Sequence, residues 1–143
     1  MKQFNIRVYG ILTNESGEVL ISTERRKGHT FTKFPGGGLE FGEGTKECLA
    51  RELKEELNVD AEIGELVYLT DFFQQSAFHP DHQLISIYYR ASVANSMDIL
   101  VSMLAQGHHD EETFRWISLN DLTEEVMTFP IDKMVVQKIK ASI

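Results

Sequence analysis

The sequence predicts a single domain of the α/β or α+β class, with a mixed β-sheet covered by α-helices. Three observations support this class. The length of 143 residues matches one domain of ordinary size. Apolar residues make up 42% of the chain and charged residues 25%, the balance of a globular protein with its own core. Segments with strand-like and helix-like apolar spacing alternate along the chain.

The first part of the chain is predicted to form short strands. Residues 4–12 alternate between apolar and polar side chains, which is typical of a strand with two unlike faces. Residues 14–17 have the composition of a turn, so residues 19–22 are expected to form the antiparallel partner strand. A glycine cluster follows, and we expect extended segments at 31–34 and 39–41 on its two sides.

Residues 45–57 carry the clearest helical pattern in the sequence. Thr45 is the expected N-cap, and Asn58 is expected to end the helix in the left-handed conformation. Three leucines recur every four residues and would share one side of this helix: Leu49, Leu53 and Leu57.

The second half of the chain returns to strands and ends in a helix. Residues 96–112 are ambiguous, because an apolar stretch gives way to a polar loop. The other predicted elements are strands at 66–73, 84–94 and 114–119, a turn or short helix at 120–122, and a final helix from about Ile131.

Charge and composition exclude several classes of protein. The net charge of −8 and the isoelectric point near 5.1 argue against nucleic acid as the main partner, since binding to a duplex relies on Lys and Arg. No apolar run approaches the roughly 18 residues that cross a bilayer, and the N-terminus does not have the pattern of a signal peptide. The single cysteine, Cys48, fits a reducing compartment, so we expect a cytoplasmic protein.

Three glutamates on the predicted helix form the most informative cluster. Glu52, Glu55 and Glu56 are three and four residues apart and would share one face beside the leucine side. Two carboxylates about 5 Å apart repel by roughly 3 kcal/mol at an effective dielectric constant near 20. Arg51 and Lys54 are expected to point away from the three acids, so a divalent cation is expected to neutralise them. All-oxygen ligands suit Mg²⁺, and also Mn²⁺.

A glycine turn, Pro35-Gly36-Gly37-Gly38, lies just before this helix. Glycines let the backbone approach other groups closely, so a main-chain carbonyl or N–H of this turn could reach the same metal or a phosphate. Gly37 and Gly38 are therefore candidate substrate-binding residues.

The turn and the helix together resemble the signature of the Nudix hydrolase family, the MutT-like proteins. The family pattern is G-x5-E-x7-R-E-U-x-E-E-x-G-U, where U is aliphatic. In this sequence Gly37 is followed after five residues by Glu43, and after seven more by the segment from Arg51 to Val59. One position departs from the pattern, because Asn58 stands where the family has Gly. Asn tolerates the left-handed conformation, so the departure is interpreted as structural.

The resemblance implies a Nudix fold and Mg²⁺-dependent hydrolysis of a nucleoside diphosphate linked to another moiety. Nucleoside triphosphates, nucleotide sugars and dinucleoside polyphosphates all fit that description. By the same resemblance, Glu52, Glu55 and Glu56 would be metal ligands, and Gly36 would supply a carbonyl ligand. Arg51 and Glu43 would form the pair that orients the helix and the loop.

The general base is left open by the sequence. Glu55 or Glu56 could act through a bound water. The acidic run Asp110, Glu111 and Glu112 resembles a downstream loop that supplies a base or an extra ligand in some family members, and we favour Glu112 among the three.

Other charged residues carry weaker signals. Arg25, Arg26 and Lys33 flank the glycine turn and could hold phosphates, although solvent-facing charge explains them about equally well. The alternative function is a nucleotide-binding or regulatory domain that has lost turnover; the intact acidic set argues against it. Isomerase chemistry on a diphosphate ester ranks lower, because the only cysteine lies inside the motif. A homodimer is compatible with the resemblance, and no residue tests it.

Overall fold

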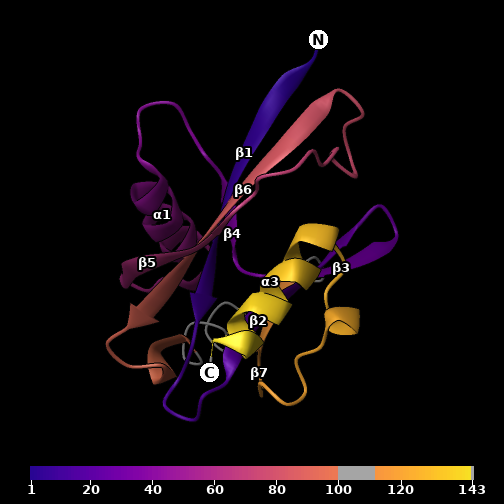
Figure 1. Ribbon diagram of the computed structural model, residues 1–143. Coiled ribbons are helices and arrows are strands. Elements are labelled where there is room, and N and C mark those ends of the chain that lie inside the picture. Colours follow the sequence, from indigo (N-terminus) through magenta and orange to yellow (C-terminus); the bar gives the residue numbers. More distant parts are fainter. Residues whose placement is uncertain (100–111, 143) are drawn as a thin grey trace.

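The structure, a computed structural model, describes residues 1–99 and 112–142. Its helices and strands are β1 (Gln3–Leu12), β2 (Val19–Arg26), β3 (His29–Lys33), β4 (Gly36–Gly38), α1 (Thr45–Leu57), β5 (Ala61–Leu69), β6 (His82–Val93), β7 (Glu112–Ile117), the 3₁₀ turn η1 (Glu124–Val126) and α3 (Pro130–Ala141). Figure 1 shows β1 and β6 side by side, with α1 and α3 to either side of them.

The described strands form two sheets. The larger has the order β4-β1-β6-β5, in which β1 and β6 are parallel and the outer pairs are antiparallel. The smaller is antiparallel, with the order β3-β2-β7. The mixed α and β class is confirmed, but the strands divide between two sheets instead of one.

The predicted pairing of the first two strands is wrong. Apart from a single bridge between Thr13 and Val19, β2 pairs with β3 and β7. The reason is packing, because Val8 of β1 and Leu20 of β2 are both buried in the core cluster under α1. The two strands contribute side chains to this core from different sheets, so the turn at residues 14–17 connects one sheet to the other.

Helix α1 covers one face of the larger sheet. Its leucines at 49, 53 and 57 are buried, as their spacing predicts, and pack with Val8 and Leu12 of β1. Asn58 ends the helix with a φ of +54°, which confirms the expected left-handed conformation. The N-cap is Gly44 and not Thr45; the Thr45 hydroxyl instead hydrogen-bonds the Tyr89 hydroxyl at 2.5 Å.

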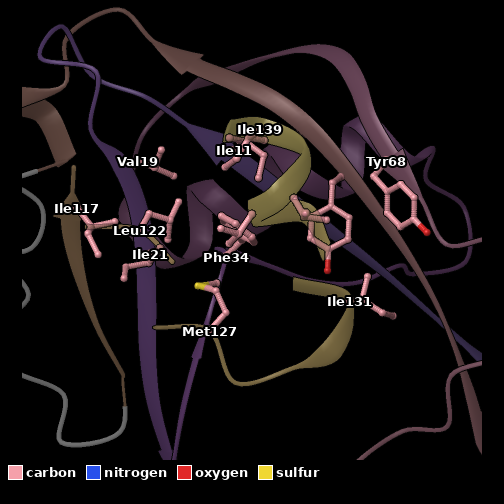
Figure 2. Close-up of a cluster of buried hydrophobic side chains, with 13 residues drawn as sticks. Ile11, Val19, Ile21, Phe34, Tyr68, Ile117, Leu122, Met127, Ile131 and Ile139 are labelled. Carbon is pink, nitrogen blue, oxygen red and sulfur yellow. The ribbon is translucent and has the colours of Figure 1, made fainter. Parts of the chain in front are cut away.

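Helix α3 covers the opposite face, over a second cluster of buried side chains. Figure 2 shows Ile131 and Ile139 of α3 with Ile11 of β1, Ile21 of β2 and Phe34. Alternate residues of β1 thus face different helices: Val8 lies under α1, while Ile11 lies under α3. The alternation that predicted two unlike faces for residues 4–12 is confirmed.

Several element bounds differ from the prediction. The glycines 36–38 themselves form β4, whereas residues 39–41 belong to no strand. Strand β5 covers residues 61–69, so the predicted strand at 66–73 begins too late and ends too late. Most of the ambiguous segment 96–112 lies outside the described residues. Of the helices that the structure describes, none combines the length and the apolar character that crossing a membrane needs.

Candidate active site

The carboxylate of Glu52 lies directly against the glycine turn. A Cβ atom added at Gly37 would lie 2.3 Å from the Glu52 carboxyl carbon, so any larger residue would push this carboxylate out of its present position. The Glu52 side chain is 15% exposed. At Gly36, an added Cβ would lie 2.1 Å from the backbone oxygen of Val8. Strand β4 lies close to both β1 and the acidic helix, and glycines, which have no side chain, allow this close approach.

Arg51 ties this helix to the preceding loop. Its Nε and Nη2 donate to the two oxygens of Glu43 at 2.9 and 2.8 Å, and Nη2 also donates to the carbonyl of Gly38 at 3.1 Å. The bond from Arg51 lowers the pKa of Glu43 to about 2. The predicted pairing of Arg51 with Glu43 is therefore present, with the bidentate geometry that such pairs favour.

The expectation that Arg51 points away from the acids is wrong. Its Nη1 lies 3.1 Å from Glu52 and 3.3 Å from Glu55. A long guanidinium side chain curls along the helix surface and reaches neighbours that its Cα position alone would exclude. The expectation for Lys54 is correct, since its Nζ pairs with Asp60 at 3.3 Å. Part of the charge on the acidic face is thus neutralised by the protein itself.

Glu56 is in a different environment from its neighbours. Its Oε2 atom is buried and has no hydrogen-bond partner. Burial, together with the nearby charge of Glu112, raises the pKa of Glu56 to about 8, although Lys33 opposes the shift. Glu55 is more exposed, at 57% of its side chain. Of the three predicted acids, two therefore face the protein interior and one faces solvent.

Glu112 lies close to this buried acid although it is far away in sequence. It opens β7 and accepts a hydrogen bond from the Ser22 hydroxyl at 2.6 Å. The Nζ of Lys33 lies 3.5 Å from Glu112 and 4.0 Å from Glu24. The structure thus brings the favoured downstream acid to the acidic helix; Asp110 and Glu111 lie outside the described residues.

A pocket opens beside the acids, between β1 and β6 on one side and the β2–β3 hairpin on the other. Arg7, Glu24 and Lys33 line it, and the aromatic side chains of Phe31, Phe78 and Phe129 also belong to its wall. The carboxylates of α1 are not part of the lining. Arg7 and Lys33 connect the two regions, because both side chains also interact electrostatically with carboxylates of α1.

The two predicted substrate-binding arginines are separated. Arg26 lines the pocket, where its guanidinium lies 5.0 Å from the centre of the Phe78 ring and 3.3 Å from Glu24. Arg25, the preceding residue on β2, is not among the lining residues. Adjacent residues of a strand point to opposite faces, which accounts for the difference.

Asp132 is a pocket residue that the sequence analysis missed. It is 3% exposed, lies in the first turn of α3 and accepts a hydrogen bond from the Tyr88 hydroxyl at 2.5 Å. Burial raises the pKa of Asp132 to about 7, against the lowering effects of Tyr88 and Lys33. A carboxylate next to Ile131, on the apolar side of the final helix, was the available signal.

The residues present fit a hard divalent cation, but they do not form a finished cage. No three of the described His, Cys, Asp and Glu side chains are grouped as a ready metal site. The guanidinium of Arg51 lies against Glu52 and Glu55 instead. The buried, unpartnered oxygen of Glu56 is the observation that favours a cation, because such an oxygen is costly unless something binds it.

The comparison with known families agrees with this geometry. A sequence profile described as the NUDIX domain matches residues 3–138. The chain belongs to the Nudix family. It is similar to a protein of Escherichia coli (strain K12) named 8-oxo-dGTP diphosphatase, with 39% identity over 61 residues, 41% of this chain and 46% of that protein. It is also similar to an RNA pyrophosphohydrolase of Acinetobacter baylyi, with 40% identity over 60 residues, 42% of this chain and 35% of that protein.

These two alignments each span less than half of the curated relative. Solved structures extend the similarity over nearly the whole chain. A NUDIX hydrolase from Nitrosomonas europaea has a TM-score of 0.74 at 16% identity, covering 98% of this chain and 90% of the other. A MutT protein from Methanosarcina mazei has a TM-score of 0.71 at 22% identity, covering 99% and 96%. At these identities the structural likeness establishes the fold.

Proposed function

We propose that this Nudix protein is a Mg²⁺-dependent hydrolase that cleaves the phosphoanhydride bond of a nucleoside diphosphate linked to another moiety. One observation carries the proposal. The Glu52 carboxylate is packed on the glycine turn, and the Glu56 carboxylate keeps a buried oxygen without a partner beside it. Carboxylates held in this way, next to a pocket with a mixed polar and aromatic wall, are suited to bind a metal together with an anionic substrate.

The proposed division of labour follows the positions of the side chains. Glu52, Glu55 and Glu56 would hold the metal, with the carbonyl of Gly36 as a further ligand. Mg²⁺ in this position would neutralise phosphate charge and acidify a bound water. Arg51 would hold the acidic helix against Gly38 through the contacts described above, and the pocket would take the nucleoside end of the substrate.

The attacking water must also give up a proton, so the reaction needs a residue that accepts it. Glu112 is our candidate for its acceptor, with Glu56 as the alternative. The Ser22 hydroxyl donates to the Glu112 carboxylate at 2.6 Å, the Lys33 ammonium lies 3.5 Å from it, and the charge of Glu112 helps to raise the pKa of Glu56. Replacing Glu112 by glutamine removes the basic oxygen and leaves Glu52, Glu55 and Glu56 in place, so this variant should lose turnover and keep its metal binding if Glu112 accepts the proton.

The substrate class follows only in outline. The curated relatives are named as a diphosphatase of 8-oxo-dGTP and as an RNA pyrophosphohydrolase, and both kinds of molecule carry a nucleoside joined to a chain of phosphates. The mixed polar and aromatic lining of the pocket favours a planar base next to charged phosphates. Cytoplasmic location and homodimer formation stay predictions.

The test is a screen for product release with a panel of nucleoside triphosphates, nucleotide sugars, dinucleoside polyphosphates and a 5′-triphosphorylated RNA. We expect Mg²⁺-dependent cleavage of at least one class and a loss of at least a hundredfold in Glu56→Gln. Glu62→Gln is the matched control, because it removes the same charge from an exposed position on β5. Binding of nucleotide without turnover on any substrate would instead favour a regulatory domain.

A further inference from the structure

The wall of the pocket holds three basic side chains, which are Arg7, Arg26 and Lys33. Two of them are paired with acids, since Arg26 lies 3.3 Å from Glu24 and Lys33 lies 3.5 Å from Glu112. Within residues 1–99 and 112–142, Arg7 forms no ion pair. Arg7 is therefore the cation of the pocket wall whose charge the described residues leave unpaired.

Most donors of the Arg7 guanidinium have no acceptor in the described part of the protein. Its Nε donates to the Tyr9 hydroxyl at 3.2 Å, and this is the one side-chain hydrogen bond of Arg7 to a described residue. Burial on its own would lower the pKa of Arg7, but Tyr9 and the charges of Glu52 and Glu24 raise it above its ordinary value. Arg7 therefore keeps its charge, and the N–H groups of both Nη atoms are available. A planar fork of such donors matches the oxygens of a phosphate.

Arg7 borders both the pocket and the glycine turn. On β1 it is the partner of Gly38 on β4, and a Cβ added at Gly38 would lie 3.2 Å from Arg7 Nη1. The guanidinium thus lies against the same turn on which the Glu52 carboxylate is packed. The three phenylalanines of the pocket wall come from other elements, namely β3, the segment between β5 and β6, and the N-cap of α3.

The position of Arg7 suits one part of a nucleotide in particular. The first phosphate of a nucleotide is joined to the nucleoside on one side and to the remaining phosphates on the other. With the base against the aromatic wall and the remaining phosphates at the acids of α1, this phosphate would lie where the pocket meets the glycine turn. It would supply both the acceptors and the countercharge that Arg7 lacks.

We propose that Arg7 binds the phosphate nearest the nucleoside. The inference rests on the proposed function, in which the nucleoside end of the substrate occupies the pocket, and it deepens that function by giving the substrate a direction. It also makes Arg7, in place of the arginines predicted from the sequence, the residue by which the pocket distinguishes a nucleotide from a nucleoside.

Equilibrium binding without metal tests the inference separately from turnover. With a chelator present, wild type, Arg7→Gln and Arg115→Gln are titrated with the four common nucleoside 5′-monophosphates and with the corresponding nucleosides. The amide signals of the protein in nuclear magnetic resonance spectra report the binding. We expect the wild type to bind at least one monophosphate and Arg7→Gln to bind it at least about tenfold more weakly, while both bind the nucleoside equally well. Arg115→Gln should retain the wild-type affinities, because it removes the same charge from an exposed position on β7 outside the pocket.

Three results would overturn the inference. In the first, Arg7→Gln binds the monophosphate as tightly as the wild type. In the second, it loses affinity for monophosphate and nucleoside alike, which would make Arg7 a structural residue of the pocket. In the third, the wild type binds no monophosphate. In each case Mg²⁺-dependent cleavage in the substrate screen would leave the proposed function standing.

A second variant decides the question if circular dichroism shows that Arg7→Gln does not fold. Arg7→Lys keeps the positive charge but cannot make a bidentate contact with a phosphate, so it should bind the monophosphate at least about threefold more weakly than the wild type. Its affinity for the nucleoside should be unchanged. An unchanged affinity for the monophosphate would contradict the inference.

Discussion

Replacing Glu56 by glutamine should stabilise the metal-free protein at neutral pH. Glu56 is buried among Glu112, Glu52 and Glu24, and its carboxyl group has a pKa of about 8 instead of 4.5. The folded protein therefore keeps the proton at a pH where the unfolded chain releases it. Glutamine has nearly the same shape and carries no charge, so it removes this penalty and leaves the packing of α1 unchanged.

The expected magnitude follows from the two pKa values. For an acid whose pKa is raised on folding, the stability of the wild type is highest below pH 4.5 and falls as the pH rises to about 8. Each unit between the two values corresponds to about 1.4 kcal/mol. At pH 7 this group alone lowers the free energy of unfolding by about 3 kcal/mol relative to its value below pH 4.5. The free energy of unfolding of Glu56→Gln should thus equal that of the wild type near pH 4.5 and exceed it by a growing amount at higher pH.

Urea unfolding with a chelator present, at pH 5, 7 and 8, measures the effect. Glu55→Gln is the matched control, since it changes the same charge one residue away at a position that is 57% exposed. Saturating Mg²⁺ should stabilise the wild type more than Glu56→Gln. If the unfolding free energies of wild type and Glu56→Gln run parallel across this pH range, Glu56 is not a desolvated acid, and the burial argument is wrong.

Three further changes test other parts of the structure. Gly37→Ala places a Cβ 2.3 Å from the Glu52 carboxyl carbon, so the carboxylate has to move from its present position and Mn²⁺ affinity should fall. At Gly38 the nearest atom to an added Cβ is Arg7 Nη1 at 3.2 Å, and no acid of α1 has to move, so Gly38→Ala should retain the affinity. Equal affinities would refute the proposal that the position of Glu52 on the turn matters for metal binding. The wild type should lose thermal stability between pH 4 and 7, because burial raises the pKa of Asp132 from 3.8 to about 7. Asp132→Asn should reduce this loss, since the amide carries no charge and its oxygen still accepts from the Tyr88 hydroxyl. A melting temperature that varies with pH as in the wild type would count against the burial of this acid. Leu53→Ala, at a fully buried position on the inner face of α1, should lower the free energy of unfolding by about 3 kcal/mol. A loss below about 1 kcal/mol in chemical unfolding would contradict its place in the core.

The sequence predicts local structure here better than it predicts pairing. Helix α1 and its end at Asn58 follow from spacing and from residue conformation alone, because both depend on neighbours within one or two turns. The pairing of β2 depends on which core cluster its side chains join. That is decided by residues such as Leu20 and Trp116, which are far apart in sequence but lie opposite each other in the smaller sheet.

The site shows the same division. The motif places the three glutamates and predicts the pairing of Arg51 with Glu43, because motif and helix geometry are both local. It says nothing of Arg7, Glu24 or Asp132, which come to the pocket from separate strands and from α3. It also gives the wrong direction for Arg51, because the reach of a long side chain depends on the partners that the fold brings near it.

Anomalous diffraction from crystals grown with Mn²⁺ would test most directly whether the acids of α1 hold a metal ion. The expected result is an ion bound by Glu52 and Glu56 next to the glycine turn, with the Arg51 guanidinium moved off Glu55 and still paired with Glu43. An ion bound elsewhere on the chain, with Glu52 and Glu56 positioned as they are in this structure, would contradict the account.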